Sequence, residues 1–481
     1  MDDLYYILPE IILVAAALIV LTVDFFLPEG RRPGLAWPAA VAPLVSLGFV
    51  IAFWGTERTL YSGTLQIDEY ALFFKGLFLV ITFFVLVGSP GYVRKNLRHP
   101  AEFYGLVLLA AVGAMAVSSA RELLTAYISL ELVSFGFYSL SSQAKHELRS
   151  NEAGAKYIIL GAFSSALLLY GISLVFGATG TTFYSGISQG AQTAAGLGPG
   201  MLLGITLLIS GLGFKVAAVP FHMWTPDVYE GAPLPITAFL SVGSKSAGFA
   251  FLIRLFAEGL GPVMGDWRVA IGILAVLTMT LGNLVAMQQR NIKRLLAYSS
   301  IAQAGYVLVG AAALTDQTSA GMMLHLAGYT VTNLGAFLAV IFYNNATGRE
   351  RIAEFRGLSR RSIFLALALA ACLFSLAGLP LFAGFATKFY LFSAAAASGM
   401  WWLVAFAIAN SIVSVYYYLV IIREMFVAPS PDPEEERTPL RIPLHANAAL
   451  GVLVVLVLWI GLYPNPIVQA AEAGSRAIFG S

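Results

Sequence analysis

The stretch Gly211-Leu-Gly-Phe-Lys-Val-Ala-Ala-Val-Pro220 places a lysine inside an apolar run and follows it with a proline. The whole run, at about 199–223, is long enough to cross a bilayer. Because proline has no backbone N–H, the carbonyl of Val216 loses its helical partner. A free carbonyl at membrane depth must be met by protein or by water. The stretch therefore predicts a hydrated helix break one residue away from Lys215.

The composition around this stretch is that of a membrane protein. The 481 residues are 58% hydrophobic and only 11% charged, with a mean hydropathy of +0.80, whereas a soluble domain carries about 25% charged residues. Long apolar runs recur along the whole chain, so we expect one membrane domain over residues 1–481. The net charge of +2 gives no reason to expect nucleic-acid binding, and the single Cys372 excludes disulfides within the chain. The N-terminus lacks a basic signal region, so the first run is expected to remain as a helix.

The apolar runs predict an all-α integral membrane fold with about fourteen transmembrane helices. One run, 363–394, is long for a single crossing and contains Leu376-Ala-Gly-Leu-Pro-Leu-Phe-Ala-Gly384, so we expect a second broken helix there. The predicted spans are about 4–27, 34–54, 70–92, 102–119, 122–143, 154–177, 199–223, 234–257, 268–287, 294–314, 318–343, 363–394, 399–425 and 445–463.

The distribution of basic residues predicts the orientation of these spans. If the loops alternate between the two sides, 19 of the 28 Lys and Arg residues lie opposite the N-terminus. Five lie on the N-terminal side, Arg254 among them, and four lysines remain inside spans. The positive-inside rule therefore predicts that both termini lie outside. The polar linker 428–437 is expected to be a solvated loop.

Five ionisable residues are predicted to lie within spans, where a charge costs roughly 2.5–3.5 kcal/mol even on the lenient insertion scale. They are Glu131, Lys75, Lys215, Lys245 and Lys388. Lys75 follows Asp68 and Glu69 closely, so we favour a lysine that reaches back to the headgroups. Glu10 and Asp24 lie near the ends of the first span, so for them too we favour a position near the headgroups over a place in a proton path.

The other four have many apolar residues on both sides, which favours a proton path over a structural role. Pro220 lies beside Lys215, and Pro380, flanked by Gly378 and Gly384, precedes Lys388. Two interrupted helices in separate halves of a chain are the sequence pattern of a repeat-built transporter. The alternatives are buried ion pairs that fix helix register and prolines that merely kink a packed helix.

Lysine suits proton transfer because burial penalises its charged form, so that it can gain and lose a proton near neutral pH. A carboxylate close by favours the charged form. We therefore hypothesise that Glu131 and Lys215 form a switch, in which the lysine holds its proton when paired and releases it when separated. His222 and His325 are possible proton relays, although each could equally be a buried histidine with satisfied hydrogen bonds.

Signatures of other chemistry are missing from the sequence. It contains no glycine-rich phosphate loop after a strand and no pair of histidines at metal-binding spacing. We expect neither a metal site nor a bound flavin or iron–sulfur cluster, and hence no redox centre in this chain.

The stretch from Pro220 to Leu240 resembles the signature of the antiporter-like membrane subunits of respiratory complex I, the NADH-quinone oxidoreductase. Its core, Met-Trp-Thr-Pro-Asp-Val-Tyr-Glu-Gly-Ala-Pro, is most similar to the subunit N branch. Lys388 stands where the M branch has a glutamate, and the long lateral helix of the L branch is missing before Ser481. The similarity extends through all four buried ionisable residues and thus covers essentially the whole chain.

This resemblance implies two inverted five-helix repeats, about 102–257 and 268–425, each with a broken helix, after a three-helix segment at 1–95 and before a last helix at 445–463. It implies that Glu131 and Lys215 form a modulating pair, that Lys245 is the central relay and that Lys388 exchanges protons on the exit side. NADH, FMN, iron–sulfur clusters and quinone would be used by other subunits. The expected partners are neighbouring membrane subunits, especially antiporter-like ones, and the lipid bilayer.

Two other functions stay open at this point. The chain could belong to a multisubunit sodium/proton antiporter, which shares the fold and the buried lysines, although the sequence of residues 220–240 disfavours this. It could also be a structural subunit that has lost transport, but idle buried charges would cost stability. The expected location is a bacterial inner membrane, and the excess of Arg over Lys, with much Ala and Gly, suggests a GC-rich genome.

Overall fold

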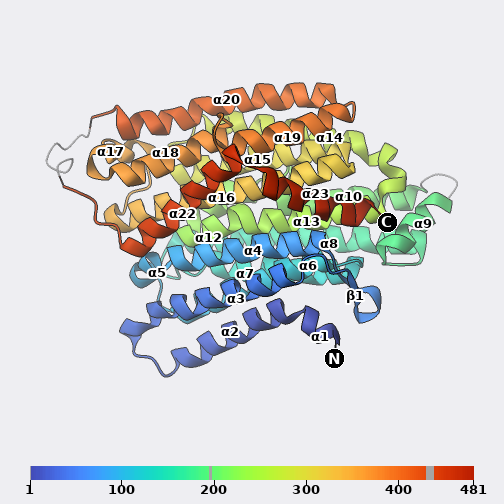
Figure 1. The fold of residues 1–481 in the computed structure, drawn as a ribbon, viewed down its shortest axis with the longest axis horizontal. Helices are drawn as coiled ribbons and strands as arrows, with labels where there is room; N and C mark the ends of the chain where they lie inside the picture. The colour runs from blue at the N-terminus through green and yellow to red at the C-terminus, as the bar shows by residue number, and fades with distance from the viewer. Residues whose placement is uncertain (1, 194–197, 430–437, 481) are drawn as a thin grey trace.

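In the computed structural model, which describes residues 2–193, 198–429 and 438–480, long helices lie side by side along one common direction (Figure 1). Both termini lie towards the same end of this bundle, together with β1 and α9, and the basic segments α5 and α17 lie at the opposite end. This arrangement agrees with an even number of crossings. The predicted loop 428–437 falls almost entirely outside the described residues.

The N-terminal segment consists of helices joined at one end by a short hairpin. The antiparallel strands β1 and β2 pair Thr59 with Gln66, a small departure from an all-helical fold. The elements are α1 (Asp2–Tyr6), α2 (Leu8–Asp24), η1 (Glu29–Leu35), α3 (Ala36–Ala52), β1 (Arg58–Leu60), η2 (Tyr61–Gly63), β2 (Leu65–Ile67), α4 (Glu69–Gly88) and α5 (Pro90–Asn96).

The middle of the chain contains the first predicted break. Its elements are α6 (Pro100–Ser119), α7 (Leu123–Ser141), α8 (Leu148–Thr179), α9 (Tyr184–Thr193), α10 (Pro199–Val216), α11 (Trp224–Gly231), α12 (Leu234–Phe239), η3 (Leu240–Ser244), α13 (Lys245–Arg254) and η4 (Leu255–Gly259). The segments η3 and η4 are π-helical turns on either side of α13. Such turns occur frequently at functional sites.

The C-terminal half contains the second break. Its elements are η5 (Gly261–Val263), α14 (Met264–Ala286), α15 (Ile292–Ala313), α16 (Asp316–Thr347), η6 (Ile352–Phe355), α17 (Leu358–Arg361), α18 (Ile363–Ala377), α19 (Ala383–Ala397), α20 (Trp401–Phe426), α22 (Leu444–Leu462) and α23 (Asn465–Phe479). The most apolar stretch of α16 is entirely buried, which makes α16 a central helix of the bundle.

The predicted count of fourteen spans is confirmed. Within the described residues, twelve helices are long and apolar enough to cross a membrane. The other two predicted crossings are α2, which has 17 residues, and the interrupted pair α18 and α19. The sequence did not predict the short helices α9 and α11 or the C-terminal helix α23, because none of them is a long apolar run.

Both predicted helix breaks are present, and both begin with the same backbone turn. Helix α10 ends at Ala217, with φ 61°, and α18 ends at Gly378, with φ 83°. In each case the next amide donates to the carbonyl five residues earlier, Ala218 to Gly213 and Leu379 to Phe374. This is the left-handed cap that ends many helices. A non-glycine residue in this region costs about 1–2 kcal/mol, so the surrounding structure must hold Ala217 in place.

The second break requires a glycine on its far side. A Cβ on Gly384 would lie 1.7 Å from the carbonyl oxygen of Ser375, so two backbone segments touch there. We expect Gly384→Ala to push α19 away from α18 and to lower the free energy of unfolding by about 1–3 kcal/mol. Thermal unfolding of the purified complex would measure this. Gly177→Ala is the control, because open space surrounds Gly177; equal melting temperatures for both variants would contradict the prediction.

Candidate functional site

Four helical elements carry the predicted proton-path residues into the interior of the bundle. Glu131 lies on α7, Lys215 on the last turn of α10, Lys245 at the start of α13 and Lys388 on α19. All three lysines are buried, and Glu131 is 13% exposed. The prediction that these lysines lie inside the protein is confirmed.

Lys215 and Glu131 form the ion pair that the sequence analysis hypothesised. The Lys215 Nζ lies 3.1 Å from Glu131 Oε1 and donates to the hydroxyls of Ser134 at 2.7 Å and Ser165 at 3.3 Å. Ser165 in turn donates to Glu131 Oε1 at 2.6 Å. The ammonium therefore has three oxygen neighbours, and two of them are neutral hydroxyls that can remain when the carboxylate moves.

Lys245 has a sparser environment. Its Nζ donates to Ser300 Oγ of α15 at 2.6 Å, and it forms no ion pair within the described residues. On the same helix, Gly248 packs against α10, since a Cβ there would lie 2.9 Å from Val216 Cγ1 and 3.4 Å from Lys215 Cβ. The first turn of α13 thus lies directly beside the lysine of the first break.

Lys388 is tied to the second break itself. Its Nζ donates to the carbonyl of Leu376 at 2.9 Å and to Ser411 Oγ at 3.2 Å, and it lies 4.6 Å from the centre of the Tyr306 ring. Gln303 also donates to the Leu376 carbonyl, at 3.1 Å. Pro380 has no N–H to donate to this carbonyl, and the buried lysine is one of the two groups that satisfy it.

An apolar groove opens beside Lys388, with a volume of about 770 Å³. It runs between α19 and α20, and its wall includes Phe385, Phe389 and Trp401, which are all exposed on the surface of the single chain. Lys388 and Ser411 are the polar side chains at its inner side near the break. The groove therefore brings Lys388 close to the outer face of the bundle.

Polar residues of α16 connect the Lys245 helix with the second break. Asn333 donates to Ser241 Oγ at 2.7 Å and Tyr329 donates to the Ser241 carbonyl at 3.0 Å, in the π-turn before Lys245. Helix α16 also contacts the second break, where Thr332 shares a hydrogen bond of 2.9 Å with Ser375. These residues could not be predicted from the sequence, because isolated hydroxyls and amides in apolar helices carry no distinctive pattern and often bond only to their own helix.

The two histidines differ in their surroundings. The Nδ1 of His325 lies 3.1 Å from Thr387 Oγ1, next to Lys388 in the chain, and its Nε2 has no hydrogen-bond partner among the described residues. His222 lies in the first break, and its Nδ1 likewise lacks a partner there. The structure thus places His325 beside the second lysine site and His222 beside the first break, without a direct contact to either lysine.

The half-helix α11 is held at its far end by charge. Asp227 accepts from Lys156 at 2.8 Å and from Arg294 at 3.0 Å, and Glu230 accepts from Arg294 at 2.8 Å. Burial disfavours the charge on Asp227, but these hydrogen bonds outweigh it and hold the pKa of the carboxyl below its usual value. At the other end of α11, Trp224 Nε1 donates to the Phe214 carbonyl at 3.0 Å. The clamp therefore fixes the segment that follows the first break.

Two expectations about charged residues were wrong. Lys75 does not reach the headgroups, since it is only 1% exposed and its Nζ lies 2.8 Å from Glu10 Oε1. Arg254 does not lie in an outer loop but at the end of α13, where it is fully buried and pairs with Asp68 at 2.5 Å. Neighbouring residues alone could not reveal this, because both partners are distant in the sequence. Without Arg254, the loops on the N-terminal side hold one basic residue fewer, so the difference in basic residues between the two sides becomes larger.

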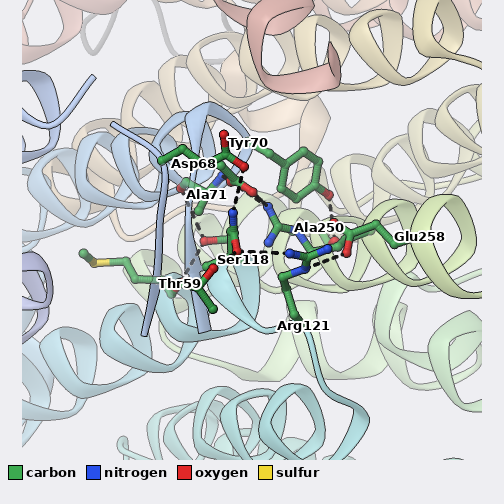
Figure 2. A network of polar contacts seen from close by, with 12 residues as sticks. Thr59, Asp68, Tyr70, Ala71, Ser118, Arg121, Ala250 and Glu258 are labelled. Atoms are coloured by element: carbon green, nitrogen blue, oxygen red, sulfur yellow. Dashed lines mark hydrogen bonds and ion pairs between the residues drawn. The ribbon is translucent and has the colours of Figure 1, made fainter. Parts of the chain in front are cut away.

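Figure 2 labels Asp68, Arg121 and Glu258, which come from three different parts of the chain, and Arg254 forms ion pairs with Asp68 and Glu258. Asp68 caps α4 by accepting from Ala71 N at 2.8 Å, and Arg121 donates to Glu258 at 2.9 Å. Tyr70 donates to the Ala250 carbonyl at 2.7 Å. The network fixes the outer end of α13, nine residues beyond Lys245.

Within the described residues, no three His, Cys, Asp or Glu side chains are grouped so that they could hold a metal ion. The arrangement instead offers lysines, a carboxylate and hydroxyls at membrane depth. These groups can hold and pass protons.

Residues 120–414 match the protein family described as NADH:quinone oxidoreductase/Mrp antiporter, TM, and the chain belongs to this family of membrane subunits. Within the family it groups with NADH-quinone oxidoreductase subunit N, an antiporter-like subunit of the membrane arm. The subunit N of Desulforamulus reducens is 41% identical over 470 residues, which cover 97% of each chain.

Solved structures agree with this assignment. A chain of respiratory complex I from Thermus thermophilus with bound aureothin has a TM-score of 0.80 and 33% identity, over 97% of this chain and all of that one. A chain of the Mrp complex from Dietzia has a TM-score of 0.85 but only 21% identity, over 99% of this chain and 97% of that one. The second likeness shows the shared fold alone.

Proposed function

We propose that this chain carries protons across the membrane along the row Glu131, Lys215, Lys245 and Lys388. The observation that supports this most directly is the Lys215–Glu131 ion pair beside a helix break. A titratable ammonium, a carboxylate and two hydroxyls meet there at membrane depth, and each group can bind or release a proton. A buried lysine recurs at the second break, where Lys388 donates to a backbone carbonyl and to one hydroxyl.

Each residue in the row has a distinct role. Glu131 stabilises the protonated form of Lys215 while the two are paired, and its withdrawal favours release of the proton. Lys245 accepts the proton in the centre, where no carboxylate opposes its release. Lys388 exchanges it on the exit side, next to the apolar groove. His325 is a possible relay between the last two through Thr387, and His222 a possible relay at the first break.

The energy for this movement comes from other subunits. In this proposal they oxidise NADH and reduce quinone with their own FMN and iron–sulfur clusters, and this chain holds no redox centre. The partners are neighbouring membrane subunits, especially antiporter-like ones. The chain resides in a bacterial inner membrane with both termini outside, and residues 102–257 and 268–425 are the two inverted repeats, flanked by segments 1–95 and 445–463.

The test is to replace Lys215 and measure two activities in membrane vesicles, NADH-driven quinone reduction and proton pumping. We expect Lys215→Ala to lower both together by roughly tenfold or more, as is typical when a proton-transfer group is lost, while the complex still assembles. Lys215→Arg should lower both activities as well, because arginine keeps the positive charge but cannot release its proton.

Lys145→Ala is the control, since Lys145 is 60% exposed and lies outside the row. Unchanged NADH-driven pumping in both Lys215 variants would refute the proposed path. Sodium-dependent antiport would then be the next activity to measure, because the fold is shared with Mrp antiporters.

A further inference from the structure

A second buried lysine–carboxylate pair lies outside the proposed row. It joins α2 to α4 in the N-terminal segment, where Lys75 Nζ lies 2.8 Å from Glu10 Oε1. Lys75 is 1% exposed and Glu10 is 13% exposed. A buried ionisable pair between membrane helices is costly, which makes it a candidate functional site by default.

This pair resembles the Glu131–Lys215 pair in its construction. In both, the lysine is almost inaccessible, whereas the carboxylate is 13% exposed. In both, a single carboxylate oxygen forms the contact with the ammonium. The chain thus uses the same chemical unit twice, at sites that share no residue.

The pair differs from a buried ion pair that serves structure alone, and Asp68–Arg254 provides the comparison. Both oxygens of Asp68 are occupied, by Arg254 and by the amide of Ala71. Arginine also keeps its proton permanently. By contrast, Glu10 Oε2 is buried without a hydrogen-bond partner among the described residues, and lysine can lose its proton when buried. The unpaired oxygen of Glu10 is therefore available to accept a proton.

Other charges around the pair are few. Helix α3, which packs against both α2 and α4, carries no ionisable side chain, and α6 carries only one charged residue, Glu102, at its opposite end. Asp24 lies at the far end of α2, and the charges of η1 and α5 lie towards that end as well. Beyond α4, His325 contacts Thr387 and Glu472 accepts from Tyr390.

At the start of α4, Asp68 is already paired with Arg254, and Glu69 follows it. No further ion pair of Glu10 or Lys75 is formed within the described residues. The state of the pair therefore depends mainly on its two members.

We propose that Glu10 and Lys75 form a second proton-exchange site, located in the N-terminal three-helix segment and separate from the Lys215 row. A proton passes from Lys75 Nζ to Glu10 Oε1, leaving a neutral amine and a neutral carboxylic acid. Rotation of the carboxyl group then turns the protonated oxygen to the side of Glu10 that has no hydrogen-bond partner, where the acid releases the proton, and the amine is recharged by a proton from the protein interior. This inference rests on the proposed proton transport by the chain.

The test uses Lys75→Met and Glu10→Gln in the intact complex, with protons pumped per quinone reduced as the readout. Glu10→Gln keeps the side-chain length, Lys75→Met is one atom shorter, and both remove the titratable group. We expect each variant to assemble and to pump fewer protons per quinone, with the ratio lowered by a similar fraction in both single variants and in the double variant. Wild-type ratios in assembled variants would overturn the proposal.

A charge-swapped variant, Glu10→Lys with Lys75→Glu, separates proton exchange from simple helix pairing. It keeps an ion pair between α2 and α4 but moves the lysine to the outer position. If the swap restores assembly but not the pumping ratio, the proposal is supported, also where the single variants fail to assemble. If the swap restores both assembly and the pumping ratio, the ion pair only holds α2 against α4 and the proposal is wrong.

Lys215→Ala in the same assay keeps the two proposals apart. Loss of activity with Lys215→Ala but wild-type pumping with Lys75→Met would refute only the second site. Wild-type pumping in Lys215→Ala would refute the Lys215 row itself.

Discussion

Lys245→Met is expected to reduce both NADH-driven quinone reduction and proton pumping by roughly tenfold or more, the scale on which proton-transfer groups act. The reason is the position of the lysine. Its Nζ contacts only Ser300 Oγ among the described side chains, and Gly248 on the same helix packs against Lys215. Methionine fills nearly the same volume, so packing should persist while the row loses its central proton carrier.

Matched replacements make this expectation specific. Ser300→Ala removes the hydrogen-bond partner of Lys245 but leaves the amine, so we expect a smaller loss and a shifted pH dependence of pumping. Lys145→Met controls for the loss of a positive charge at an exposed site. Full activity of Lys245→Met in an assembled complex would show that protons bypass the centre of the row.

Arg254→Met is expected to impair assembly and thermal stability rather than proton chemistry. The replacement leaves Asp68 and Glu258 buried without their shared partner (Figure 2). Breaking one side of a buried ion pair costs about 3–5 kcal/mol because the remaining charge is uncompensated. Native gel electrophoresis of detergent-solubilised membranes would show less complex, with a lower melting temperature for the fraction that assembles.

A double-mutant cycle tests the cause. Asp68→Asn removes the opposing charge, while asparagine can still cap α4 by accepting from Ala71. We therefore expect the double variant Asp68→Asn with Arg254→Met to be more stable than Arg254→Met alone. Strictly additive losses would mean that the two side chains act independently and that their ion pair is not the source of stability.

Much of the fold could be predicted from the sequence because a bilayer imposes a simple local rule. A crossing needs an apolar run of a certain length, and all fourteen predicted runs correspond to helices or to an interrupted helix pair. Pro220 and Pro380 predicted both breaks, since the lack of an N–H acts within a single turn. Helix α23 was missed because it is amphipathic and short, and Glu472 and Arg476 interrupt its apolar run along the sequence.

The candidate site could be predicted only in part. A lysine inside a long apolar run is conspicuous in the sequence, so Lys215, Lys245 and Lys388 could be predicted as site residues without knowledge of their partners in space. Their hydroxyl and carbonyl partners, such as Ser165 and Leu376, are ordinary residues in the sequence. They gain a role only through the approach of a distant helix.

The sequence by itself determined that Glu131, Lys215, Lys245 and Lys388 lie within membrane helices, because long apolar runs on both sides place each residue far from water. Only the tertiary structure decided what each buried charge does there. It turned Lys75 from a lysine near a helix end into the partner of Glu10, and Arg254 from a loop residue into the anchor of α13. Electrostatic pairing acts over a few ångströms in space, and these partners are separated by 65 and 186 residues along the chain.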